Sequence, residues 1–143
     1  MALHWHSKIQ AWLPPGGHIA ENEDPVEAVV REIAEETGMA TKVVQITPPF
    51  ELAYPKQVQP PLTIMVEDIH DPVVGYHQHV DMIYVCRPTG AVSPLPLGWR
   101  WVSQTELADG VSLVRDDGSA EPPPKDVRVI GLHALQIVSD SIR

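Results

Sequence analysis

The segment from Gly17 to Met39 constrains this chain most, because it encodes a helix with both of its ends marked. Asp24 can cap the helix, Pro25 suits its first position, and Glu27 completes a capping box. Gly38 suits the left-handed position that follows a last helical turn. The sequence therefore predicts a helix that begins at Pro25 and ends just before Gly38.

This helix is expected to have one apolar and one acidic face. Apolar residues recur at i, i+3, i+4 and i+7, which places four of them on one side: Val26, Val29, Val30 and Ile33. The opposite face is expected to carry Ala28, Arg31, Glu32, Glu35 and Glu36. Because residues three and four apart are neighbours on a helix, Glu32, Glu35 and Glu36 should converge within one turn.

Two interpretations of the three glutamates are open. Carboxylates about 6 Å apart repel each other by roughly 0.7 kcal/mol in water, so a solvated acidic face is inexpensive. Alternatively, the glutamates hold a hard cation such as Mg²⁺, which prefers oxygen ligands and bridges carboxylates to substrate phosphates. The Pro14-Pro15-Gly16-Gly17 stretch before the helix would let the backbone approach that same metal closely.

The segment resembles the signature box of the Nudix hydrolases. That box reads Gly, five residues, Glu, seven residues, Arg-Glu, apolar, any, Glu-Glu, any, Gly, apolar. The corresponding residues match without exception: Gly17, Glu23, Arg31, Glu32, Ile33, Glu35, Glu36, Gly38 and Met39. The box covers 23 of the 143 residues. The resemblance implies an α/β/α sandwich with a mixed sheet between the box helix and a C-terminal helix.

The resemblance also implies roles for the box residues. Glu32, Glu35 and Glu36 would hold Mg²⁺ or Mn²⁺, and the carbonyl of Gly17 would be a further ligand. Arg31 would orient the glutamates, and Glu23 would act structurally near the loop. The implied reaction is attack of water on a phosphorus of a nucleoside diphosphate linked to another moiety, such as a nucleoside triphosphate, ADP-ribose or a nucleotide sugar.

Composition limits the other possibilities. The chain is the size of one domain, residues 1–143, and 43% of it is apolar, enough for a core. Its net charge of −9 argues against binding to nucleic acid or to an anionic membrane. The single cysteine, Cys86, excludes an internal disulfide and is expected to be a packed core thiol. We see no signal peptide or membrane-length apolar run, so a cytoplasmic location is the default.

The remaining pattern predicts five strands and a second helix. The expected strands are 2–7, 41–47, 62–67, 80–87 and 100–103, the fourth of them long and mostly buried, and the expected helix is 126–142. The expected loops are 48–61, 68–78, 88–98 and 109–125. Only 16 residues precede Gly17, so the first strand looks shortened relative to the family. An open sheet edge is a liability, and a homodimer would cover it.

The general base is not marked by the sequence. Relatives take this acid either from the box or from a distant loop, and residues 93–99 offer no carboxylate. Glu32 is one candidate, and the late-loop acids Asp116, Asp117 and Glu121 are others. Those three acids are equally compatible with ordinary solvated loop positions.

Several residues outside the glutamate set are candidates for substrate contact. His77, His79 and Asp81 alternate, so on a strand they would share one face. They could contact phosphate, form an auxiliary site for Zn, Fe or Mn, or simply line a polar strand face. His18, next to Gly17, could contact substrate or close the loop, and Phe50 and Tyr54 could stack on a base.

Two alternatives to hydrolysis are open. An isomerase acting on a prenyl diphosphate uses a similar scaffold, but the chain is short for it and Cys86 looks buried. A catalytically silent ligand sensor is the other alternative. The complete box argues against a sensor, because loss of catalysis would leave Glu35 and Glu36 free to change.

Overall fold

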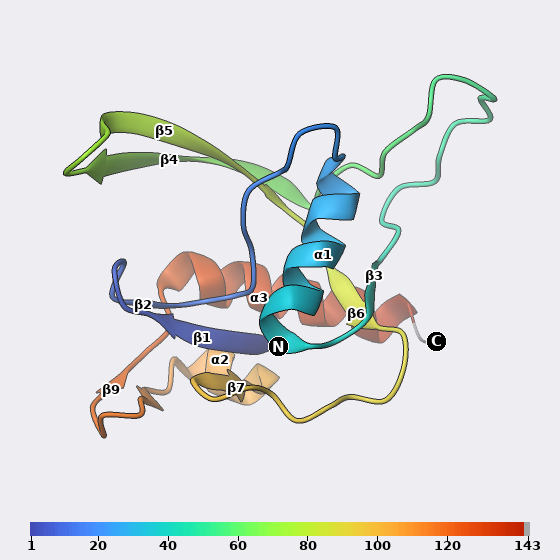
Figure 1. Ribbon diagram of the computed structural model, residues 1–143. Helices are drawn as coiled ribbons and strands as arrows, with labels where there is room; N and C mark the ends of the chain where they lie inside the picture. Colours follow the sequence, from blue (N-terminus) through green and yellow to red (C-terminus); the bar gives the residue numbers. More distant parts are fainter. Residues whose placement is uncertain (142–143) are drawn as a thin grey trace.

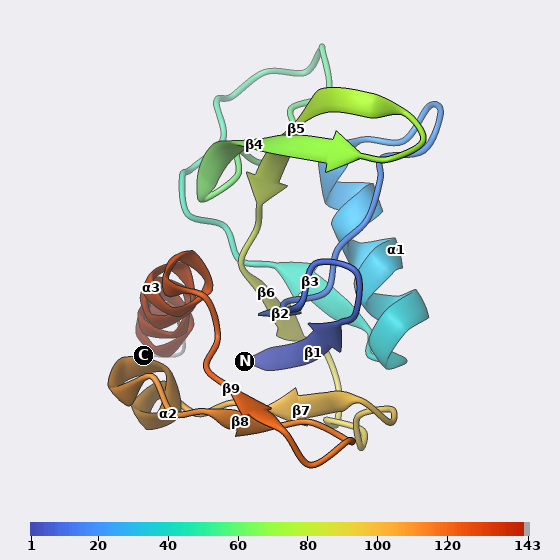
Figure 2. The same ribbon diagram turned by 90° about the vertical axis from the view of Figure 1, so that its left-hand side faces the viewer.

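The computed structural model describes residues 1–141 as an α/β fold in which strands lie between two long helices. Helix α1 (Pro25–Thr37) lies on one side of the strands and helix α3 (Lys125–Ser141) on the other, as Figures 1 and 2 show. The predicted α/β sandwich is confirmed. The predicted end of the last helix at Ile142 lies outside the described residues.

Within residues 1–141, the strands form four hydrogen-bonded groups. Strand β1 (Ala2–His6) pairs antiparallel with β2 (Ala11–Leu13) and with β7 (Trp99–Trp101). Strand β3 (Thr41–Val43) pairs with β6 (Cys86–Pro88), and β8 (Leu113–Val114) pairs with β9 (Ala120–Glu121). The fourth group is a hairpin of β4 (Thr63–Asp71) and β5 (Gly75–Ile83).

The core lies between the β2-β1-β7 sheet and the helices α2 (Gln104–Asp109) and α3. Its buried residues come from the first strands and from the last third of the chain: Leu3, Trp12, Val102, Leu107, Leu113 and Val127. Cys86 is half-buried, and burial raises the pKa of its thiol to about 11, as suits a packed and unreactive cysteine.

Helix α1 begins and ends where the sequence predicts. Asp24 accepts hydrogen bonds from the backbone N–H groups of Val26 and Glu27, and the capping box with Glu27 is complete. Gly38 has φ 71° and closes the last turn. Ala28, expected on the acidic face, is buried together with Ile33 and Thr37. The glycine-rich segment covers part of that face.

Several strand boundaries differ from the prediction. The expected strand 41–47 ends at Val43, and the expected strand 80–87 divides into β5 and β6 at Tyr84 and Val85. The expected loop 68–78 is instead most of a nine-pair hairpin ladder from Thr63↔Ile83 to Asp71↔Gly75. Nor is β5 mostly buried, since alternate residues along it are exposed. The short elements β2, α2, β8 and β9 were not expected.

Candidate active site

The loop between β2 and α1, residues 14–24, runs against the acidic side of the helix; we call it the glycine loop. The backbone N–H of Gly16 donates to Glu36 Oε2 at 3.0 Å. A Cβ atom at Gly17 would lie 2.3–2.5 Å from the carboxylate atoms of Glu32. No side chain fits at that distance, so the glycine lets the loop backbone come into contact with a carboxylate of the helix.

Arg31 ties the glycine loop to the glutamates. Its Nε and Nη2 donate to the two carboxylate oxygens of Glu23 at 2.8 and 2.9 Å, a bidentate pair. Its Nη1 donates to Glu32 at 2.8 Å and lies 3.3 Å from Glu35, and Nη2 also donates to the carbonyl of His18 at 3.0 Å. These bonds to Glu23 and then Glu32 raise the pKa of Arg31. Arg31 therefore fixes the loop and one glutamate in a single arrangement.

Glu23 has a depressed pKa as a result. The Arg31 side chain, and after it the backbone N–H of Ala20, lower the pKa of Glu23 from 4.5 to about 2. Glu23 is thus the residue whose ionisation holds the start of the helix and the loop together. The structural role expected for Glu23 stays a prediction, and these contacts place its carboxylate on Arg31 and on the loop backbone.

Protonation of Glu23 is expected to weaken the fold. A carboxyl group with a lowered folded pKa stabilises fully above its ordinary value, and this contribution is lost as pH falls from 4.5 toward 2. In urea unfolding, Glu23→Gln should therefore be less stable than the wild type at neutral pH. The difference should shrink steadily below pH 4.5. Glu21→Gln, exposed in the same loop, should follow the wild type. A gap that stays constant over this range would contradict the assignment.

The pKa of Glu36 is raised, whereas that of Glu23 is lowered. Burial raises its pKa, the hydrogen bond from Gly16 opposes that rise, and the charge of Glu32 adds to it. His6 on β1 also acts on Glu36, with the opposite sign. No sequence motif includes His6, and the alternation of side chains along β1 is the signal that places it on the α1 side of the sheet.

These residues suit a hard divalent cation. The set consists of carboxylate oxygens of Glu32, Glu35 and Glu36 together with the Gly17 carbonyl, and Mg²⁺ prefers oxygen donors. The missing Cβ at Gly17 leaves the backbone and the Glu32 carboxylate in direct reach of a shared ion. Within residues 1–141, no three His, Cys, Asp or Glu side chains are already arranged as a complete metal site. Here Arg31 and Gly16 hold the glutamates by hydrogen bonds, and Glu35 is the most exposed of them.

The structure brings three of the predicted histidines together. His77 and His79 share one face of β5, with their Nε2 atoms 3.3 Å apart. His18 of the glycine loop approaches His79 edge-on, with ring centres 5.8 Å apart. Asp81 follows on the same strand face by alternation. The predicted common face is thus present, and it meets the loop that enters α1.

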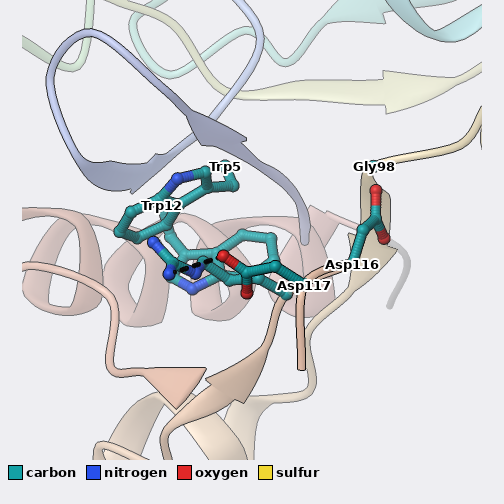
Figure 3. Close-up of a pocket in the computed structure, with 6 residues that line it drawn as sticks. Trp5, Trp12, Gly98, Asp116 and Asp117 are labelled. Atoms are coloured by element: carbon teal, nitrogen blue, oxygen red, sulfur yellow. Dashed lines mark hydrogen bonds and ion pairs between the residues drawn. The ribbon is translucent and has the colours of Figure 1, made fainter. Parts of the chain in front are cut away.

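The late-loop acids lie elsewhere. Trp5 and Trp12 face each other across β1 and β2 on the face opposite to His6, and they line a hollow of about 230 Å³ with Gly98, Arg115, Asp116 and Asp117 (Figure 3). Arg115 stacks on Trp5 at 4.3 Å and pairs with Asp117 at 2.9 Å. Hydrogen bonds from Ser119 lower the pKa of Asp117, which makes it a weak base. Glu121 is an exposed residue of β9.

The two aromatic candidates are not packed at the glutamates. Phe50 and Tyr54 are 79% and 87% exposed, on the long loop that extends away from α1 in Figure 1. Lys56 of the same loop binds Asp24 at 2.6 Å and Glu27 at 3.1 Å, so the loop is fastened to the start of the helix. Lys56 was missed because its partners lie about 30 residues away.

This chain is similar to known proteins in sequence and in fold. A family model described as NUDIX domain matches residues 2–122. An RNA pyrophosphohydrolase of Thioalkalivibrio sulfidiphilus (strain HL-EbGR7) is 44% identical over 46 residues, which are 31% of this chain and 27% of that protein. The match therefore spans about a quarter of the relative's length. A NUDIX family hydrolase from Clostridium perfringens has a structure similar to this one, with a TM-score of 0.71 and 26% identity over 96% of this chain and 88% of that one.

In the described part of the chain, none of the helices has the length and apolar character that a bilayer crossing needs.

Proposed function

The chain belongs to the Nudix hydrolase family, and from this premise we propose that it is a metal-dependent pyrophosphohydrolase. Its substrate would be a nucleoside diphosphate linked to another moiety, cleaved by attack of water on phosphorus. The observation that carries the proposal is the contact between the glycine loop and the helix glutamates. The Gly16 N–H meets Glu36, and Gly17 has no room for a Cβ atom beside Glu32.

The proposed roles follow from these contacts. Glu32, Glu35, Glu36 and the Gly17 carbonyl would hold Mg²⁺, with Mn²⁺ as the alternative. A bound divalent cation lowers the pKa of coordinated water and offsets the charge of the phosphates. Arg31 orients Glu32 through its 2.8 Å bond, and Gly16 orients Glu36. Without such a cation, a chain of net charge −9 would repel an anionic substrate.

We assign the general base to the helix. Glu32 lies against the glycine loop and can accept a proton from water on the oxygen that Arg31 does not hold. Asp116 and Asp117 are less suitable, because they line a hollow on the opposite face of the β1-β2 pair. His18, His77, His79 and Asp81 lie together near the glycine loop, apart from the late-loop acids.

The substrate is proposed only as a class. The relative named RNA pyrophosphohydrolase supports cleavage of a phosphoric anhydride, while the net charge of −9 favours a free nucleotide over RNA. Phe50 and Tyr54 could reach a base only if their loop folded inward. A homodimer remains a prediction of this proposal.

A substrate panel tests the proposal. The protein is incubated with the common nucleoside triphosphates, 8-oxo-dGTP, ADP-ribose, NADH, dinucleoside polyphosphates and 5′-triphosphorylated RNA, with Mg²⁺ or with Mn²⁺. We expect release of phosphate, pyrophosphate or a nucleoside monophosphate from at least one compound, and none after chelation of the metal. Turnover that persists without metal would refute the proposal. Binding without turnover throughout the panel would favour the sensor alternative.

A further inference from the structure

The β4-β5 hairpin is poorly anchored to the rest of the molecule. Its nine residue pairs join β4 to β5, and no ladder within residues 1–141 joins either strand to a third. Its outer face is exposed, including Ile64, Val66 and Val80 at about 60% each. A two-stranded ribbon is marginally stable alone, so its inner face must supply the attachment. That face carries His77 and His79 and meets the glycine loop at His18.

The tautomer of His77 follows from the hydrogen-bond partner of its Nδ1 atom. Its Nδ1 lies 3.1 Å from the carbonyl oxygen of Gly75, which can only accept, so Nδ1 carries the hydrogen. The Nε2 lone pair of His77 is then free and points toward Nε2 of His79. A backbone carbonyl that accepts from one ring nitrogen while the other is free is the usual arrangement around a metal-binding histidine.

The distances between His77 and His79 match those of two ligands on one tetrahedral ion. Two nitrogens bound to one zinc at about 2.0–2.1 Å in tetrahedral geometry lie about 3.3–3.4 Å apart, and their ring centres about 5 Å apart. In the structure the two Nε2 atoms are 3.3 Å apart and the ring centres 5.1 Å apart. The ring centre of His18 is 5.8 Å from that of His79, slightly wider. His18 is exposed, so its ring is free to turn toward the pair.

We propose that His18, His77 and His79 form a binding site for a transition metal ion of the zinc type, which fastens the hairpin to the glycine loop. Imidazole nitrogens favour Zn²⁺ over Mg²⁺, so this site is chemically distinct from the glutamates. Glu67, directly across from His79, and Asp81 flank the pair on the same face and can supply the fourth ligand. The site does not depend on the hydrolysis proposed above.

Zinc titration tests the site without any enzyme assay. Chelator-treated protein is titrated calorimetrically with ZnCl₂ in excess Mg²⁺, which occupies oxygen-ligand sites, and with Co²⁺ while visible absorption is recorded. We expect one zinc per chain and the intense Co²⁺ bands of a tetrahedral site. His77→Ala, His79→Ala and His18→Ala should each weaken zinc binding at least tenfold. His18→Ala changes an exposed loop residue, so its result does not depend on whether the hairpin variants fold.

Matched variants separate this site from the glutamate site. His70→Ala removes a histidine of the same hairpin that packs on Tyr76 instead, and it should bind zinc like the wild type. Glu36→Gln should also bind zinc like the wild type, although its Mg²⁺ binding should be lost. No uptake of zinc, or equal uptake by the wild type and the three histidine variants, would mean that His77 and His79 form only an N–H···N hydrogen bond and would overturn the proposal.

Discussion

Replacing Glu36 by glutamine is expected to lower kcat by roughly 100- to 1,000-fold, because a cation that stabilises developing charge contributes several kcal/mol to the transition state. The amide keeps an oxygen that can accept from the Gly16 N–H, so the loop contact at 3.0 Å is retained. What is lost is the negative charge that holds the ion. Initial rates with the best substrate of the panel, over a range of Mg²⁺ concentrations, measure the effect.

The Mg²⁺ dependence identifies the cause of the loss. If Glu36 is a ligand, half-saturation by Mg²⁺ should move to higher concentration in Glu36→Gln, while the circular dichroism spectrum and melting temperature stay close to those of the wild type. Glu51→Gln, which removes the same charge from an exposed loop position, should leave both rate and metal dependence unchanged. Full activity of Glu36→Gln at the wild-type Mg²⁺ requirement would remove Glu36 from the site.

Helix α1 was predictable because its determinants are local. The cap at Asp24, the capping box with Glu27 and the left-handed Gly38 all act within a few residues of the helix ends. Helix α2 carries the same kind of signal, since Ser103 and Glu106 form a capping box and Gly110 ends the helix with φ 63°. Helix α2 was not predicted because its six residues are too few to show an apolar periodicity.

The hairpin was missed for a different reason. Its turn is marked by Asp71, which accepts from the N–H groups of Val73 and Val74, and by Gly75 with φ 89°. The residues of β4 and β5 next to the turn are mostly polar, however, and this composition is typical of a loop. An amphipathic strand exposed on one face lacks the apolar run that identifies a buried strand. The cross-strand pairing that stabilises it is not visible in either arm alone.

In the candidate site, too, contacts within one segment were predictable and contacts between distant segments were not. The glutamates and Arg31 lie within two turns of one helix, at spacings of three and four residues, so their proximity follows from the helix itself. The contacts between distant segments could not be predicted from the sequence. They are Gly16 with Glu36, His6 near Glu36, and His18 beside His79. Each of them depends on how β1, the glycine loop and the hairpin pack around α1, and no pattern within one segment encodes that packing.

Gly17→Ala is expected to lower kcat/KM by roughly 100-fold, the loss that a misplacement of about 1 Å can cause in an active site. The new Cβ would lie 2.3 Å from Glu32 Cδ, so the Glu32 carboxylate would have to move. The atoms displaced are the end of a flexible side chain, so the free energy of unfolding should change by no more than about 1 kcal/mol. Steady-state kinetics and urea unfolding measure the two quantities separately.

Gly16→Ala is the matched control. No atom lies within 4 Å of the Cβ it would add, and alanine keeps the N–H that donates to Glu36. Its activity should therefore remain within about twofold of the wild type, as for a surface substitution that disturbs no contact. If both alanine variants lost activity equally, loop flexibility would be the cause. If neither lost activity, the contact between Gly17 and Glu32 would have no part in positioning the carboxylate for catalysis.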